Sequence, residues 1–168
     1  MTSVLFKMEG AMRTLQAAVL AVLVAGLSAD AGAQDVTYRK QIKPLFEAKC
    51  AGCHGAASPY FGDFDADPKK FAAAMKGPRM DSYADLIFFV GWPDTGALMR
   101  RLDDGKSAGG KPGNMYQFLG ATDEERQNNL QTFKAWVGPE GWVMNRFNAR
   151  GDVPGITREQ LEKMRVKY

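Results

Sequence analysis

The residues of this chain best suited to chemistry are gathered in one short stretch, KCAGCHG, from Lys49 to Gly55. The stretch contains both cysteines of the chain, Cys50 and Cys53, and its only histidine, His54. The spacing C-x-x-C-H is typical of the attachment site of a c-type haem. Two thiols at the end of a helix can each add to one vinyl group of the porphyrin, and the adjacent imidazole can bind its iron. We therefore predict one covalent haem c, with Cys50 and Cys53 as thioethers and His54 as the proximal ligand.

The main alternative is a structural or thioredoxin-like Cys-x-x-Cys pair. A thioredoxin-like pair requires a β-α-β context. The hydrophobic pattern of this chain predicts helices and gives no persuasive strand, which favours the haem interpretation.

The sixth ligand of the iron has to come from another residue type, because no second histidine exists in the chain. The sixth position could be filled by methionine, lysine, asparagine or an external ligand, or it could stay open. Of the nine methionines, Met115 stands out, because it lies in the Gly- and Pro-rich loop GGKPGNMYQFLG. A flexible thioether on such a loop could reach across the far face of a haem, although methionine is also an adaptable core residue. The other methionines are Met1, Met8 and Met12 in or before a signal segment, Met75, Met99 and Met164 at expected helical, core-filling positions, and Met80 and Met144 in turns.

The N-terminus has the order of a secretory signal. Lys7 and Arg13 precede an apolar run from Leu15 to Leu27, and small residues follow up to an A-x-A-like site at 31–33. A membrane span needs about 20 apolar residues, and this run is shorter. We predict a signal peptide over residues 1–33 that is cleaved on export to the periplasm, after which no membrane association is expected.

The charge of the chain excludes a nucleic-acid-binding role. The formal net charge is +3. Because Lys7 and Arg13 balance Glu9 and Asp30 within the predicted signal, the mature chain keeps that charge. This is far below the basic density that nucleic-acid binding requires.

The elements that must position the cysteines and the histidine are all predicted helices. Residues 36–49 have apolar side chains at helical spacing, with a start or a kink at Pro44, and residues 55–68 are predicted to be a loop. Further helices are predicted over 68–75, 82–90, 93–102, 122–137 and 157–166. Their predicted caps are Asp67, either Asp81 or Ser82, and capping boxes that open at Thr122 and Thr157. Residues 103–120 contain five glycines and one proline and are predicted to be a loop.

Residues 35–137 resemble a class I c-type cytochrome. The resemblance rests on a helix ending in Cys50-x-x-Cys53-His54, intermediate helices, a PGNM loop at residues 112–115, and a capped C-terminal helix. It implies an all-α class I cytochrome c-like domain around one covalent haem over residues 34–137, with a C-terminal extension over 138–168. It also implies that the first and last helices of the domain pack together, that Met115 is the sixth ligand, and that the carbonyl of Pro78 orients the ring of His54. The sequence departs from the family in a longer span between His54 and Gly77-Pro78, and in Tyr116 where a proline is common.

The function implied by this resemblance is periplasmic one-electron transfer by a His/Met-ligated haem, and not catalysis. The chain would act as a free carrier or as the cytochrome subunit of an oxidoreductase complex. The expected partners are redox proteins, and the basic residues around the PGNM loop (Arg100, Arg101, Lys106 and Lys111) would suit acidic docking surfaces. The extension would either dock on a partner or cover the core of its own domain. The alternative function is a five-coordinate haem c protein that binds gases, senses them or catalyses a reaction, which applies if Met115 does not bind iron.

Overall fold

The computed structural model of this protein describes residues 35–107, 110–143 and 156–168. The chain divides into two units, residues 1–34 and Asp35–Tyr168, and all described residues belong to the second. The described residues form helices and turns and no strand, which confirms the predicted all-α class. In chain order the elements are η1 (Tyr38–Ile42), α2 (Lys43–Lys49), α3 (Ala51–His54), α4 (Phe61–Ala66), α5 (Pro68–Ala73), α6 (Tyr83–Val90), α7 (Ala97–Leu102), η2 (Tyr116–Leu119), α8 (Asp123–Val137), α9 (Pro139–Trp142) and α10 (Arg158–Glu162).

The N-terminal helix changes type just before Pro44. Residues Tyr38–Ile42 form a π-helical turn, in which the N–H of Lys43 bonds to the carbonyl of Tyr38, and α2 then begins with Pro44 in its first turn. Proline is tolerated in a first turn because its missing N–H would have no helical partner there. The predicted start or kink at Pro44 is therefore confirmed as a change from π-helix to α-helix.

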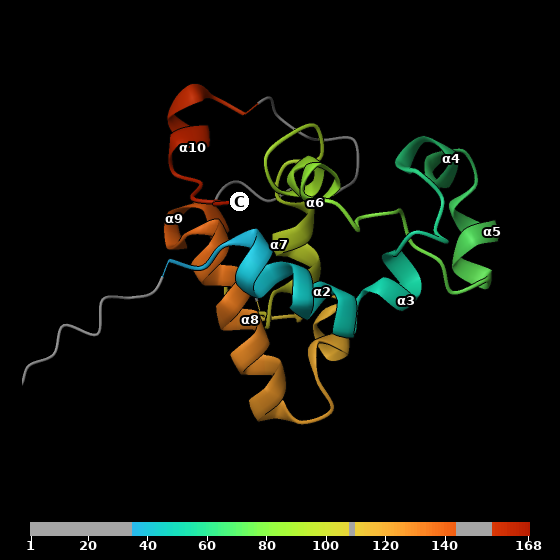
Figure 1. Ribbon diagram of the computed structural model, residues 1–168, viewed down its shortest axis with the longest axis horizontal. Helices are drawn as coiled ribbons and strands as arrows, with labels where there is room; N and C mark the ends of the chain where they lie inside the picture. Colours follow the sequence, from blue (N-terminus) through green and yellow to red (C-terminus); the bar gives the residue numbers. More distant parts are fainter. Residues whose placement is uncertain (1–34, 108–109, 144–155) are drawn as a thin grey trace, which may run out of the picture. The chain divides into compact units, whose positions relative to one another are not determined.

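Helix α8 is the longest described helix, and η1 at the start of the N-terminal helix is in direct contact with it (Figure 1). Thr122 caps its first turn by accepting a hydrogen bond from the N–H of Glu125. The carboxylate of Glu125 bonds to the N–H of Ala121 and not to that of Thr122, so the predicted capping box is only half formed. The helix ends at Gly138, whose φ of 92° favours glycine.

One hydrophobic core joins these helices. The N-terminal helix contributes Ile42 and Phe46, and α8 contributes Phe133 and Trp136, all of which are buried in the same cluster. The predicted packing of the first helix against the last helix of the domain is therefore confirmed. The other buried apolar members are Tyr38, Leu86, Phe89, Val90, Ala97, Leu98, Met99, Leu102, Leu119, Leu130, Val137 and Trp142.

Two predictions for the middle of the chain were wrong. Residues 55–68 are not all loop, because they contain α4, which packs the ring of Phe61 4.7 Å from that of Phe88. This helix has no side-chain cap, so no local signal in the sequence marks where it begins. Its contact with Phe88 is a long-range one, which sequence patterns do not predict. Helix α7 begins at Ala97 and not at Pro93, because Gly96 adopts a left-handed conformation with φ of 76°.

The prediction for the last helix was correct at its start and wrong at its end. Thr157 and Gln160 form the full capping box, but α10 ends at Glu162 instead of near Val166. The following residues, 164–168, form an extended segment that we call the C-terminal strap. Its backbone N–H groups at Arg165 and Val166 bond to the carbonyls of Val137 and Trp136, and its residue Lys167 accepts bonds from the N–H of Tyr38 and the indole of Trp136. Long-range pairing with the end of α8 therefore replaces the predicted last turn.

Candidate haem-binding site

The two cysteines and the histidine lie on one helical turn. Cys50 separates α2 from α3, and the N–H groups of Cys53 and His54 both bond to the carbonyl of Cys50, at 3.1 and 2.9 Å. Residues three apart on a helix face the same side, so both thiols point to a common surface. Both cysteines are half-buried and free of a disulfide, and burial raises the pKa of the Cys50 thiol to about 11. At neutral pH this thiol is protonated.

The ring of His54 is oriented by the carbonyl of Pro78. The distance from Nδ1 to that oxygen is 2.8 Å, so the proline carbonyl implied by the resemblance is confirmed as the partner of this ring. A carbonyl oxygen only accepts, and therefore Nδ1 carries the proton and Nε2 carries the free lone pair. Burial lowers the pKa of the imidazole, while the bond to Pro78 opposes that effect. A neutral ring with its lone pair on Nε2 is the form that binds a metal.

Gly77 holds the same ring from the side. A Cβ atom at this position would lie 2.1 Å from Cε1 of His54 and 2.6 Å from Nδ1. No real side chain tolerates such distances, so the imidazole lies directly against the backbone of residue 77. The Gly77-Pro78 pair thus supplies both the contact that packs the ring and the hydrogen bond that orients it.

Backbone hydrogen bonds fix this pair beside the cysteine motif. The N–H of Gly77 bonds to the carbonyl of Cys53, and the N–H of Met80 bonds to the carbonyl of His54, each at 2.8 Å. The hydroxyl of Ser58, which is buried, donates to the carbonyl of Cys53 at 2.9 Å. Sequence reasoning missed Ser58, because a serine in a Gly- and Pro-rich stretch is ordinary for a loop.

Met115 lies on a different segment, and we call its described residues, 103–107 and 110–119, the methionine loop. Its N–H bonds to the carbonyl of Arg101 at 2.9 Å, and the N–H of Gly113 bonds to the carbonyl of Asp103 at 2.8 Å. The loop therefore satisfies carbonyl groups at the C-terminal end of α7, which lack partners within that helix. Gly113 is required there, because an added Cβ would lie 2.2 Å from the carbonyl oxygen of Arg100. Met115 is half-buried against the same core that contacts Cys50.

The other described methionines are sorted by burial. Met99 is fully buried and Met164 is half-buried against the core, as predicted for core-filling residues. The prediction for Met75 was wrong, because this residue is 72% exposed and has a positive φ of 54° in the turn after α5. Met80 is half-buried beside Pro78. Met1, Met8, Met12 and Met144 lie outside the described residues.

The residues present fit a covalently attached haem. The structure brings Cys50, Cys53 and His54 together on one turn, presents the imidazole in its metal-binding tautomer and packs it against a glycine that leaves no room for a side chain. Met115 reaches the same hydrophobic core from a separate loop that the backbone holds against α7. A soft thioether is a suitable second ligand for a haem iron.

Comparison with known proteins gives one family and one solved structure. The family described as PccH cytochrome c matches residues 37–168, which include the C-terminal extension and leave the whole predicted signal segment, residues 1–33, outside. The solved structure of the mono-haem cytochrome PccH from Geobacter sulfurreducens is 56% identical, and the match covers 80% of this chain and 99% of that one, with a TM-score of 0.69. No curated protein matches the chain.

Proposed function

Since this chain belongs to the PccH cytochrome c family, it is an electron-transfer protein with one covalent haem c, and we propose that it works as a periplasmic one-electron carrier. In this proposal Cys50 and Cys53 form the thioether links, His54 is the proximal ligand and Met115 is the distal ligand. Family membership implies an electron carrier and not an enzyme. The signal predicted over residues 1–33 would direct export and be cleaved on export. No helix among the described residues is long and apolar enough to cross a membrane.

The observation that carries the proposal is the hydrogen bond from Nδ1 of His54 to the carbonyl of Pro78. It fixes the tautomer, so that Nε2 offers its lone pair, and it prevents the ring from rotating. When bound, haem c supplies an iron that changes between its ferric and ferrous states by one electron. Gly77 and Pro78 hold the imidazole in one orientation in both states, which favours fast transfer with little rearrangement of the chain.

The backbone of the methionine loop supports Met115 as the distal ligand. The bonds from Met115 to Arg101 and from Gly113 to Asp103 restrict the loop on both sides of residue 114. Methionine is neutral and soft, and it stabilises the ferrous form relative to a second nitrogen ligand. If His54 and Met115 both bound the iron, these two side chains would leave no position for a substrate, which would suit outer-sphere transfer.

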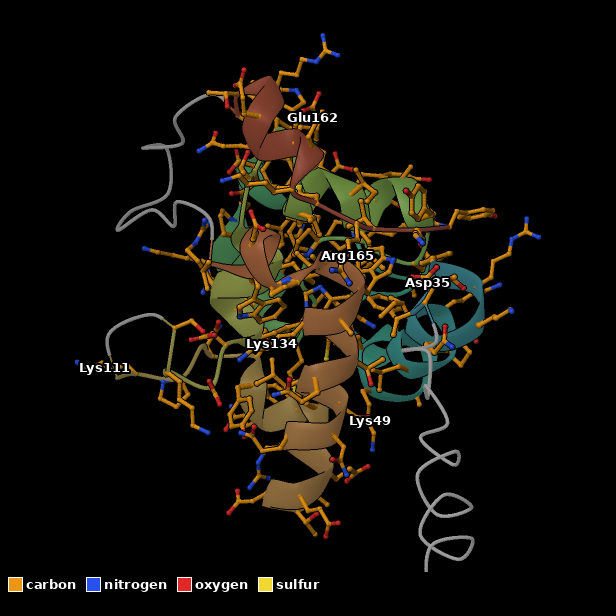
Figure 2. All side chains as sticks on the ribbon, turned by 90° about the vertical axis from the view of Figure 1, so that its left-hand side faces the viewer. Asp35, Lys49, Lys111, Lys134, Glu162 and Arg165 are labelled. Carbon is orange, nitrogen blue, oxygen red and sulfur yellow. The ribbon has the colours of Figure 1, made fainter. Side chains whose placement is uncertain are left out.

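The proposed partners are redox proteins with acidic docking surfaces. Of the four basic residues predicted around the loop, Arg100 pairs with Asp94 and Lys106 pairs with Asp104. Arg101 and Lys111 are exposed, and Lys111 lies on the outside of the methionine loop (Figure 2). Lys106 is also exposed despite its pair with Asp104, so Arg101, Lys106 and Lys111 are the cations most available to a partner. The described parts of the extension pack on their own domain, which favours a covering role for them and a free carrier over a docked subunit.

The absorption spectrum of the purified haem-loaded protein tests the ligand assignment. A ferric haem with a thioether ligand has a weak charge-transfer band at the red end of the spectrum. We expect this band in the wild type, its loss in Met115→Ala and its retention in Met80→Ala. Met80 is the matched control, because it is half-buried near the site and its backbone is bonded to His54. A wild type that lacks the band and binds carbon monoxide readily when reduced would instead indicate an open iron site.

A further inference from the structure

Trp142 and Asp103 form a buried pair that the proposed electron-transfer site does not use directly. Trp142 is 2% exposed and lies at the end of α9, in the C-terminal extension, while Asp103 is fully buried and follows α7. The indole Nε1 of Trp142 donates to Oδ1 of Asp103 at 2.9 Å. A buried carboxylate needs such donors, because an unpaired one is strongly destabilising.

Asp103 transmits this contact to the methionine loop. Its other carboxylate oxygen, Oδ2, accepts the N–H groups of Gly105 at 3.0 Å and Ser107 at 3.3 Å. Its backbone carbonyl accepts the N–H of Gly113, two residues before Met115. One residue therefore connects the extension, the start of the loop and the segment that carries the methionine.

A second set of contacts joins the same elements through α8. Lys134 pairs with Asp104 at 3.8 Å, and its Nζ lies 5.6 Å from the ring centre of Trp142. Figure 2 shows Lys134 on the side of α8 that faces the methionine loop. Gln127 donates to Asp104 and to the hydroxyl of Tyr116, the residue after Met115. The loop is thus held on both sides of the methionine by α8 and α9.

We propose that Trp142 is a positioning residue for the distal ligand. Its N–H keeps the Asp103 carboxylate in place, and Asp103 in turn keeps Gly113 and the following Met115 against α7. The extension thereby sets how readily the methionine leaves the iron, and with it the reduction potential. This inference rests on the proposed ligation by Met115. It assigns the extension a role in tuning the haem as well as in covering the core.

Loss of the indole N–H should make the sixth position easier to open. In Trp142→Phe, the buried carboxylate of Asp103 loses the indole donor, and the opening equilibrium of the loop should rise roughly tenfold. Because exogenous imidazole binds only when methionine has left, its apparent affinity for the ferric protein rises by the same factor. The amides of Gly113 and Met115 should also exchange with solvent faster by that factor, and the reduction potential should fall.

The matched control is Trp136→Phe. Trp136 is buried like Trp142, and its indole N–H is also a donor. Its acceptor is the backbone carbonyl of Lys167 in the C-terminal strap, at 2.9 Å. The Trp136→Phe protein should lose about as much global stability as Trp142→Phe. The affinity of its ferric form for imidazole should stay within about twofold of the wild type, because the lost bond does not reach the methionine loop. Equal changes in both variants would overturn the inference and leave the ligation by Met115 intact.

A measurement on the wild type avoids variants that fold poorly. Saturating imidazole should expose the indole N–H of Trp142 to exchange and leave that of Trp136 protected. Protection of both indoles in the imidazole complex would overturn the coupling between the extension and the loop. Failure of the ligand assignment is recognised separately, because Met115→Ala would then leave the charge-transfer band unchanged.

Discussion

His54 has little freedom at the scale of single residues. Pro78 accepts the hydrogen bond of its Nδ1, and Gly77 lies against its ring so closely that a Cβ atom would overlap it. Both contacts come from consecutive residues, so one short loop determines the tautomer, the orientation and the position of the ring. Loss of an orienting contact of this kind typically lowers metal affinity or activity by about 10–100-fold.

Gly77→Ala should disrupt this arrangement. The new methyl group would force the imidazole or the loop to move, and we expect a loss of stability of about 1–3 kcal/mol together with reduced haem incorporation. The haem content per chain and the denaturant midpoint of the purified protein measure both effects.

Gly52→Ala is the control for this change. Gly52 lies between the two cysteines, and an added Cβ there has no atom within 4 Å. Alanine in a helix is more favourable than glycine by about 0.5–1 kcal/mol, so this variant should bind haem normally and be at least as stable as the wild type. Similar haem loss in both variants would show that the space at Gly77 is not what matters.

Helices with local signals were predictable at the scale of elements, and those that depend on distant contacts were not. The caps at Ser82, Thr122 and Thr157 lie where the sequence predicted them. Helix α4 and the C-terminal strap were missed, because the first packs on α6 and the second bonds to the end of α8.

The site shows the same division between local and long-range signals. The C-x-x-C-H spacing is a local pattern that indicates its own chemistry, and the resemblance to class I cytochromes supplied Pro78. The bond between Trp142 and Asp103 joins residues 39 apart in sequence. Nothing about a tryptophan at position 142 or an aspartate at position 103 indicates that the two side chains are bonded. Only the fold reveals this contact.

The C-terminal strap should contribute measurably to the stability of the element it covers. The hydroxyl of Tyr83 on α6 donates to the carbonyl of Val166 at 2.8 Å. Tyr83→Phe removes this bond, and we expect a loss of about 1 kcal/mol in the free energy of unfolding. Tyr60→Phe should change stability by less than about 0.5 kcal/mol, because Tyr60 is 60% exposed. Equal denaturant midpoints for the two variants would argue against a stabilising strap.

Pairs of charges connect distant parts of the chain at the scale of the whole molecule. Lys49 at the end of α2 pairs with Glu125 in the first turn of α8, and Lys167 in the strap pairs with Asp35 at 2.5 Å. In both cases the hydrogen bond to lysine is the largest cause of a lowered carboxyl pKa. The pairs therefore connect the two ends of the second unit and the two helices that build its core.

These pKa shifts predict a small loss of stability in acid, because both carboxyl groups are exposed to solvent. A carboxyl whose pKa is lower in the folded state stabilises the protein above its unfolded value, which is ordinarily 3.8 for Asp and 4.5 for Glu. That contribution disappears as the pH falls through the folded pKa, so the denaturant midpoint should decline between about pH 5 and 3. Glu125→Gln should make the decline less steep, because residue 125 then no longer titrates. An unchanged slope in this variant would mean that Glu125 does not contribute.

The proposed electron transfer depends on Met115 as the distal ligand of the haem. Proton NMR of the ferrous protein, with isotope-labelled methionine methyl groups, tests it most directly. A methyl group held over a haem face is shifted far upfield by the ring current of the porphyrin. We predict one such methionine methyl signal, present in the wild type and in Met80→Ala and absent in Met115→Ala. No upfield methyl signal in the wild type, or one that persists in Met115→Ala, would show that Met115 is not the distal ligand.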